Sequence, residues 1–170
     1  MGREMHVLQD AFSRLPGLVR GVVDDLSIDE LAFRLDAESN TIGWLVWHLT
    51  RIQDDHIAGA AGGAQVWTSD GWAERFALPF DRSATGYGQS ADDVGAVRAD
   101  ASLLADYFDA VYARSTQFID RLGEADLDRI VDTRFDPPVT LGVRLVSVLA
   151  DDLEHVGQAA LIRGVVLRRR

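Results

Sequence analysis

Hydrophobic positions in the first part of the chain recur every three or four residues. From about residue 6 to residue 23 they form one stripe, made up of Leu8, Phe12, Leu15, Val19 and Val22. This spacing is typical of one face of an amphipathic helix. Pro16 lies inside the stripe, and because proline removes a backbone hydrogen bond and clashes with the preceding turn, we predict a kink or a break there. Ser27 and Glu30 then match a capping box, which predicts a short helix.

A second stripe predicts a helix over roughly residues 40 to 60. Ser39 or Asn40 is its expected N-cap, and Gly62-Gly63 its expected end. Its apolar face comprises Ile42, Leu45, Leu49, Ile52 and His56. His48 lies three residues after Leu45 and four before Ile52, so it borders this face instead of pointing straight into solvent.

Two further long helices are predicted in the second half of the chain. The first begins at Ser90 and continues to about Leu122, and the second is capped by Thr140 and ends at about Arg163, followed by Gly164. Residues 134–139 should be extended, because the position before each proline disfavours the helical region. Four long helices, with no repeat and no convincing strand pattern, predict an all-α four-helix bundle. A length of 170 residues with 47% hydrophobic content suits one domain over residues 1–170.

Between residues 65 and 89 the pattern loses its period. Aromatic residues lie there among glycines and a proline: Trp67, Trp72, Phe76, Phe80 and Tyr87. A long connection inside a compact domain is often a lid or a pocket wall. These rings equally suit a cover over the open end of a hydrophobic core, so both interpretations stay open.

The composition of the chain narrows the range of possible functions. A net charge of −10 argues against a nucleic-acid partner, and the arginines at 168–170 are expected to form a solvated tail. The chain has no cysteine, so any thiol in its chemistry must come from outside. No signal-peptide block and no apolar run of roughly 18 residues is present, which predicts a cytoplasmic protein that does not enter a membrane. All 17 basic residues are arginine, a bias expected of a GC-rich genome.

The last predicted helix places polar residues in its apolar stripe. Asp151 and His155 are four residues apart and therefore lie on one face, a single turn apart. A buried carboxylate is costly unless it is paired or binds a metal, and a metal shared with His48 would meet that need. Two imidazoles and a carboxylate suit zinc or a similar divalent ion. The alternative is an Asp151–His155 ion pair beside a core histidine, and Asp152 competes with Asp151 as ligand.

Two motifs resemble those of a known family. Trp44-Leu45-Val46-Trp47-His48-Leu49 resembles the helix-two motif of the DinB/YfiT-like superfamily, and His155-Val156-Gly157-Gln158 resembles its C-terminal H-x-G-Q motif. The resemblance implies a four-helix bundle with a crossover connection, and a divalent metal held by His48, Asp151 and His155. Most members have histidine at the position of Asp151. The related mycothiol-dependent maleylpyruvate isomerases have a glutamate there, but they continue into a C-terminal domain that this sequence lacks.

The resemblance also implies a class of reaction. Members with an assigned activity mostly use bacillithiol, mycothiol or glutathione, and a metal-bound thiol is deprotonated at neutral pH. We therefore expect a zinc-dependent or nickel-dependent S-transferase, acting in detoxification, with mycothiol as the thiol of a GC-rich, actinobacterium-like source. Asp55 is a candidate partner of His48 or proton acceptor, although a solvated carboxylate is the simpler interpretation, and Trp67, Trp72 and Tyr87 are candidates for the wall of an electrophile pocket. A metal-dependent hydrolase and a non-catalytic, stress-associated metal-binding bundle are the alternatives, and a homodimer is compatible with each.

Overall fold

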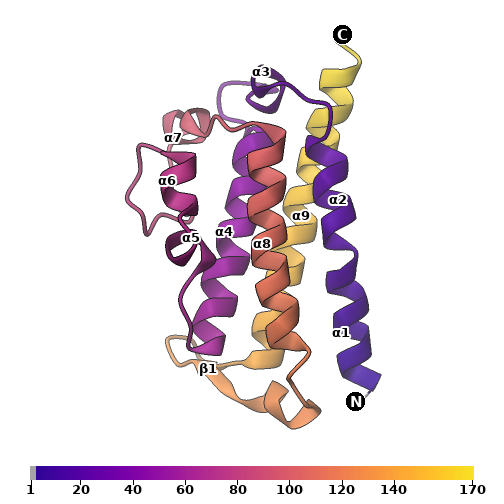
Figure 1. Ribbon diagram of the computed structural model, residues 1–170, viewed down its shortest axis with the longest axis vertical. Coiled ribbons are helices and arrows are strands. Elements are labelled where there is room, and N and C mark those ends of the chain that lie inside the picture. Colours follow the sequence, from indigo (N-terminus) through magenta and orange to yellow (C-terminus); the bar gives the residue numbers. More distant parts are fainter. Residues whose placement is uncertain (1–2) are drawn as a thin grey trace.

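A computed structural model describes residues 3–170 as an elongated helix bundle (Figure 1). The bundle is built from α1 (Arg3–Ser13), α2 (Leu15–Val23), α4 (Ile42–Ala61), α8 (Ala101–Ile119) and α9 (Leu141–Leu167). Together α1 and α2 fill one of the four positions. α4 packs against α8 and α9, and α2 packs against the same two helices. The predicted four-helix bundle is therefore confirmed.

The connection from α4 to α8 makes the fold a crossover bundle. α4 and α8 run in the same direction, so the intervening chain returns along the outside of the bundle (Figure 1). This return contains three short helices: α5 (Val66–Ser69), α6 (Trp72–Phe76) and α7 (Ala91–Ala96). The crossover implied by the family resemblance is thus present.

Local signals in the sequence explain where α2, α3 and α4 begin. The break predicted at Pro16 is confirmed, since α2 begins at Leu15 with proline in its first turn. Ser27 and Glu30 form the predicted capping box of α3 (Ile28–Leu31). The N-cap expected for α4 was wrong by one or two residues, because Thr41 accepts a hydrogen bond from the Trp44 amide at 3.0 Å.

Two predicted helix boundaries in the second half were wrong. The helix expected from Ser90 to Leu122 is divided into α7 and α8, because Asp100 accepts a hydrogen bond from the Leu103 amide and caps a new helix. Ser90 caps α7 as expected. α9 continues past Gly164 to Leu167, where burial of Val166 helps to offset the roughly 1 kcal/mol that glycine costs inside a helix.

A short hairpin precedes α9 and was not predicted. A 3-10 helix, η1 (Glu124–Asp128), leads into β1 (Ile130–Asp132), which pairs antiparallel with β2 (Val139–Thr140). Strands of three and two residues are too short to show a period of two in the sequence. The predicted extended stretch lies in this hairpin, and the peptide bond between Asp136 and Pro137 is cis. Thr140 caps α9 as predicted.

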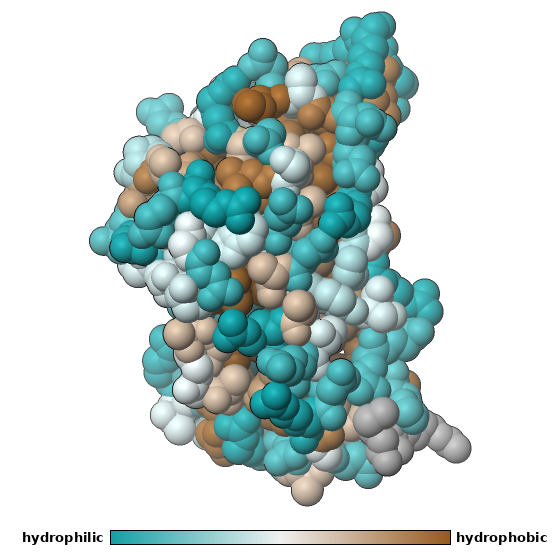
Figure 2. Space-filling view, in the orientation of Figure 1, coloured by the Kyte–Doolittle hydropathy of each residue, from teal (hydrophilic) through white to brown (hydrophobic). Residues whose placement is uncertain are grey.

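The end of the chain packs against the bundle, in contrast to the solvated tail that was expected. The Arg169 guanidinium lies 4.6 Å from the centre of the Phe33 ring, and Arg170 Nε donates a hydrogen bond to Glu30 at 2.8 Å. Elsewhere the surface in view is mostly hydrophilic, with hydrophobic residues gathered mainly in its upper half (Figure 2). Within residues 3–170, no helix is long and apolar enough to cross a membrane.

Candidate metal centre

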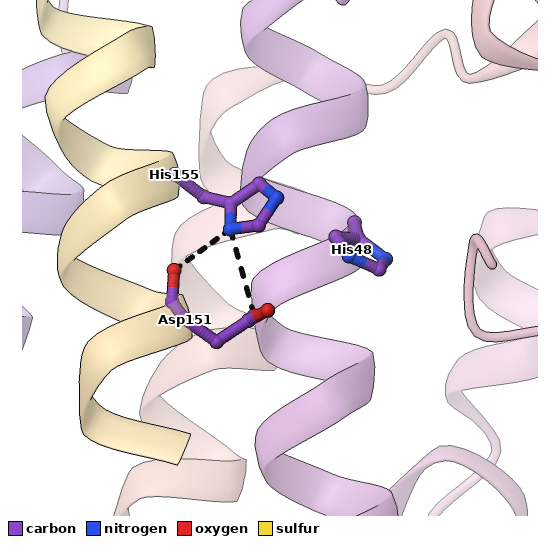
Figure 3. Close-up of side chains that lie close together, drawn as sticks. All are labelled: His48, Asp151 and His155. Carbon is purple, nitrogen blue, oxygen red and sulfur yellow. Dashed lines mark hydrogen bonds and ion pairs between the residues drawn. The ribbon is translucent and has the colours of Figure 1, made fainter. Parts of the chain in front are cut away.

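The three residues predicted as ligands meet between α4 and α9. One possible ligand atom from each of His48, Asp151 and His155 lies within 4.8 Å of the other two. Figure 3 shows His48 on α4 facing Asp151 and His155, which lie one turn apart on α9. The most extensive helix packing among the described residues, between α4 and α9, therefore brings together residues that are more than 100 positions apart.

His48 is held by groups on either side of its ring. The side chain is 4% exposed, and its Nδ1 lies 2.5 Å from the Thr85 carbonyl oxygen. Because a carbonyl oxygen can only accept, Nδ1 carries the proton in the neutral ring and Nε2 keeps its lone pair. Trp44 stacks on the imidazole, with ring centres 4.6 Å apart and an interplanar angle of 13°. Burial lowers the pKa of His48 to about 4, with Thr85 opposing that shift, so the ring is neutral near pH 7.

His155 has the same arrangement of its two nitrogens. Its Nδ1 lies 2.7 Å from the backbone carbonyl oxygen of Asp151, which can only accept, so in the neutral ring Nδ1 is the donor and Nε2 keeps its lone pair. The rings of His155 and His48 are edge to face, with centres 4.8 Å apart. Both histidines therefore have Nε2 available as a metal ligand, each fixed by a carbonyl on the opposite nitrogen, as is usual for ligating histidines.

Asp151 supplies the third donor. Its Oδ2 is buried, and no group in residues 3–170 donates a hydrogen bond to it. Burial raises the pKa of this carboxyl, and the neighbouring His155 partly opposes the rise. A buried acceptor without a donor is costly, and a cation would compensate for it. Two imidazole nitrogens and this oxygen fit a divalent ion such as zinc.

Contacts expected of the metal-free alternative are also present. His155 Nδ1 lies 3.6 Å from Asp151 Oδ2, and His48 bonds to a backbone carbonyl. Neither contact uses Nε2 of a histidine. An ion pair beside a core histidine therefore accounts for the two Nδ1 atoms and gives Asp151 Oδ2 a charged neighbour. It leaves both Nε2 atoms without a role and Asp151 Oδ2 without a hydrogen-bond donor among the described residues.

Asp151 and Asp152 have different surroundings in the structure, and only Asp151 belongs to the cluster of possible ligand atoms. Asp152 is completely buried, and neither of its carboxyl oxygens has a hydrogen-bond partner among the described residues. It lies outside the cluster of possible ligand atoms. Burial raises its pKa well above the ordinary value, and the adjacent Asp151 adds to this. The ambiguity that spacing left between the two residues is resolved in favour of Asp151 as the member of the cluster.

Of the other predicted site residues, only Tyr87 contacts the candidate metal centre. Asp55 accepts a hydrogen bond from Gln65 at 2.7 Å and lies 3.5 Å from His56, which gives it partners other than His48. Trp67 and Trp72 are buried and pack on Tyr107. These two rings belong to the core, in agreement with the interpretation that the aromatic residues of this connection cover the open end of the hydrophobic core. Tyr87 alone of the three proposed wall residues meets the centre, with its ring 5.7 Å from that of His48.

Sequence reasoning named Tyr87 but missed the backbone contacts by which its segment covers His48. Residues 84–89, which we call the strap, supply Thr85, and Gly86 follows with φ +107°. A Cβ atom at Gly86 would overlap His48 Nδ1. Trp44 was also missed as a contact, although its position four residues before His48 places it on the same face. Nothing local in the strap indicates its partner, because that contact joins residues 37 positions apart.

Comparison with known proteins agrees with this architecture. The sequence matches the model of the DinB superfamily over residues 11–159. A crystal structure described as a conserved protein from Enterococcus faecalis is similar throughout, with 26% identity and a TM-score of 0.90 over 98% of this chain and 99% of that one. None of the curated proteins matches the sequence significantly. With most of its length matched by the family model and the same bundle in its structure, the chain belongs to the DinB superfamily.

Proposed function

We propose that this protein is a metal-dependent enzyme that activates a low-molecular-weight thiol for S-transfer to a small electrophile. The observation that carries the proposal is the convergence of two imidazoles and a buried carboxylate within 4.8 Å. Membership of the DinB superfamily likewise suggests a metal-binding bundle. The metal ligands in this proposal are His48 and His155 through Nε2, and Asp151 through its carboxylate.

The donor set suits thiol chemistry. A divalent cation bound here would supply a Lewis acid that keeps a thiol ionised near pH 7, where a free thiol with a pKa near ~8.5 is mostly protonated. Three protein ligands leave room for one from outside. Two neutral imidazoles and one carboxylate leave a single positive charge on a divalent ion, which a thiolate neutralises. Because the chain has no cysteine, that thiolate comes from a cosubstrate.

Neighbouring rings have separate tasks in this proposal. Trp44 packs flat on His48 and limits rotation of the imidazole. Tyr87 lies edge-on to the same ring but is 71% exposed, so its free face is available to an incoming molecule. The choice of mycothiol rests on the arginine-only basic residues, which indicate a GC-rich source. Zinc is the first metal to test, followed by nickel.

Metal analysis of the purified protein tests the site. His48→Asn is the informative variant, because the amide of asparagine can replace Nδ1–H as donor to Thr85 but offers no Nε2. His56→Asn is the matched control, since His56 lies on the same helix outside the cluster. We expect about one divalent ion per chain in the wild type and in H56N, and a large loss in H48N. A wild type that takes up no zinc, nickel or cobalt would refute the site.

A cobalt-substituted protein tests the reaction. Addition of mycothiol, bacillithiol or glutathione should produce a sulfur-to-cobalt charge-transfer band in the wild type, strongest with mycothiol. Conjugation of the same thiol to a panel of small electrophiles should then depend on the metal. Turnover by hydrolysis without thiol would support a metal-dependent hydrolase instead. Bound metal without thiol binding or turnover would support a non-catalytic metal-binding bundle.

A further inference from the structure

Three side chains on one face of α4 hold the strap. Trp44 Nε1 donates to the Gln89 side chain at 2.7 Å, His48 Nδ1 donates to the Thr85 carbonyl at 2.5 Å, and Arg51 Nε donates to the Ala84 carbonyl at 3.1 Å. Residues 44, 48 and 51 are four and three positions apart, so they form one row along the helix. The carbonyls bound by His48 and Arg51 belong to consecutive residues of the strap.

Arg51 is an unusual residue for this row, because a charged side chain is rarely found completely buried. Its Nη1 donates to Gln65 Oε1 at 2.9 Å and lies 3.7 Å from Asp54, and its guanidinium lies 4.9 Å from the centre of the Trp67 ring. Burying a charge is costly unless several such contacts compensate for it. Arg51 contacts the strap and the start of the connection, whereas the cluster of possible ligand atoms does not include it.

Asp54 makes the support of Arg51 rigid. Its carboxylate accepts hydrogen bonds from the amides of Val66 and Trp67, at 2.8 and 2.7 Å, and from the Tyr107 hydroxyl at 3.0 Å. All three donors are buried. Arg51 is thus fixed between α4 and the α5 region, and its Nε–H is directed at a single carbonyl. Without that donor, the Ala84 carbonyl loses its bond to α4, and the adjoining Thr85 carbonyl loses the anchor nearest to it.

We infer that Arg51 is a positioning residue for the candidate metal centre, and that it acts through Ala84 and Thr85 to keep the proton of His48 on Nδ1 and leave Nε2 free to ligate. This inference rests on the metal centre in the proposed function. Arg51 does not bind the metal or the substrate in this scheme. It holds the carbonyl that selects the tautomer of His48, a role that carbonyls and carboxylates commonly have beside ligating histidines.

The test measures the tautomer of His48 in metal-free protein, by long-range proton–nitrogen correlation spectra, together with zinc affinity by competition with a chelator. Arg51→Met removes the donor. Arg144→Met is the matched control, because Arg144 is also largely buried and bonds to His56 and Asp132 but has no contact with the strap. We expect R51M to lose the single Nδ1–H form of His48 and to bind zinc about tenfold or more weakly. R144M should keep the tautomer and bind zinc within about twofold of the wild type.

Arg51→Lys is the second variant, in case R51M does not fold. Lysine keeps the buried charge but has no Nε–H, so it should lose the same tautomer preference while its amide spectrum stays dispersed. A folded R51K or R51M with wild-type tautomer and zinc affinity would overturn the inference and leave the proposed function intact. Conversely, a wild type that binds no metal would refute the proposed function, yet the tautomer of metal-free His48 would still decide the role of Arg51.

Discussion

Gly86 is the residue on which the approach of the strap to His48 depends. Its φ of +107° is disfavoured for residues with a side chain, and a Cβ atom there would overlap His48 Nδ1. Gly88, two residues further on, also has a positive φ, of +70°, but a Cβ at that position meets nothing within 4 Å. Substitutions at these two glycines therefore distinguish the cost of backbone strain from the cost of a clash with His48.

Alanine at these two positions should have different effects. Gly88→Ala should lower the free energy of unfolding by about 1 kcal/mol, the cost of a left-handed conformation. Gly86→Ala should lower it by at least about 1 kcal/mol more, because the overlap displaces either the strap or the imidazole, and it should also weaken zinc binding. Urea denaturation and chelator competition measure both quantities. Equal effects of the two substitutions would show that the strap tolerates displacement from His48.

Some residues of the site could be predicted from the sequence, and others could not. His48, Asp151 and His155 were identifiable because helical spacing places each on a face that borders the core, and two motifs resemble those of the family. Thr85, Gly86 and Arg51 were not, because their roles depend on contacts between distant residues and leave no periodic signal. That the three predicted residues bind a metal remains a prediction for the measurements above.

At the scale of helices, the position of α4 depends on its N-cap. Thr41 is completely buried, and its side chain accepts from the Trp44 amide, which places the first turn of the helix that carries His48. Ser39, one of the two expected caps, instead accepts from the amides of Leu35 and Asp36 in the preceding turn. The side-chain oxygens of Ser39 and Thr41 therefore bind different amides. Ser39 stabilises the preceding turn, and Thr41 caps α4.

Removal of the cap should destabilise the protein. Thr41→Ala leaves the Trp44 amide without its buried acceptor, so the free energy of unfolding should fall by about 1 to 2 kcal/mol. Asn40→Ala, at the other position expected as a cap, should change it by less than about 0.5 kcal/mol. Thermal and urea denaturation measure the difference. A larger loss in N40A than in T41A would contradict the assignment of the cap.

The elements differed in how well they could be predicted. Long amphipathic patterns located α1, α2, α4, α8 and α9, because burial of one face repeats the same signal over several turns. The break between α7 and α8 was missed, since the apolar spacing continues through it while Asp100 starts a new helix. The β1–β2 hairpin was missed because its strands are too short to have a pattern.

At the scale of the whole molecule, the C-terminal end of the chain is bound to the segment that follows α2. Arg170 donates to the Glu30 carboxylate and to the Asp25 carbonyl, which ties the end of α9 to the α3 region. The hydrogen bond from Arg170 is the largest of the contributions that lower the pKa of Glu30, from 4.5 to about 2. A carboxyl whose pKa is lower in the folded state stabilises the fold above its unfolded pKa, and this stabilisation is lost as the pH falls towards the folded pKa.

The Arg170 contact should therefore have a defined pH dependence. Arg170→Gln should lower the melting temperature slightly at pH 7, because the pair is at the surface. The difference from the wild type should shrink as the pH falls from about 4.5 towards 2, where Glu30 becomes protonated in both proteins. Thermal melts at matched ionic strength measure this. A difference that stays constant, or grows, over that range would show that Arg170 acts by packing and not through the Glu30 carboxylate.

By itself the sequence determined the class of fold, the approximate helices, the two histidines of the site and the pair of adjacent carboxylates beside them, because apolar periodicity and helical spacing are local patterns along the chain. Only the tertiary structure decided which carboxylate joins the two histidines. Asp151 and Asp152 are adjacent, but the packing of α9 on α4 turns the first towards His48 and the second into the core. The packing of the strap on α4 set the proton of His48 on Nδ1, since the strap brings the Thr85 carbonyl to that atom alone. Contacts between residues far apart in the sequence are set by the assembled bundle, and they have no local pattern from which to be read.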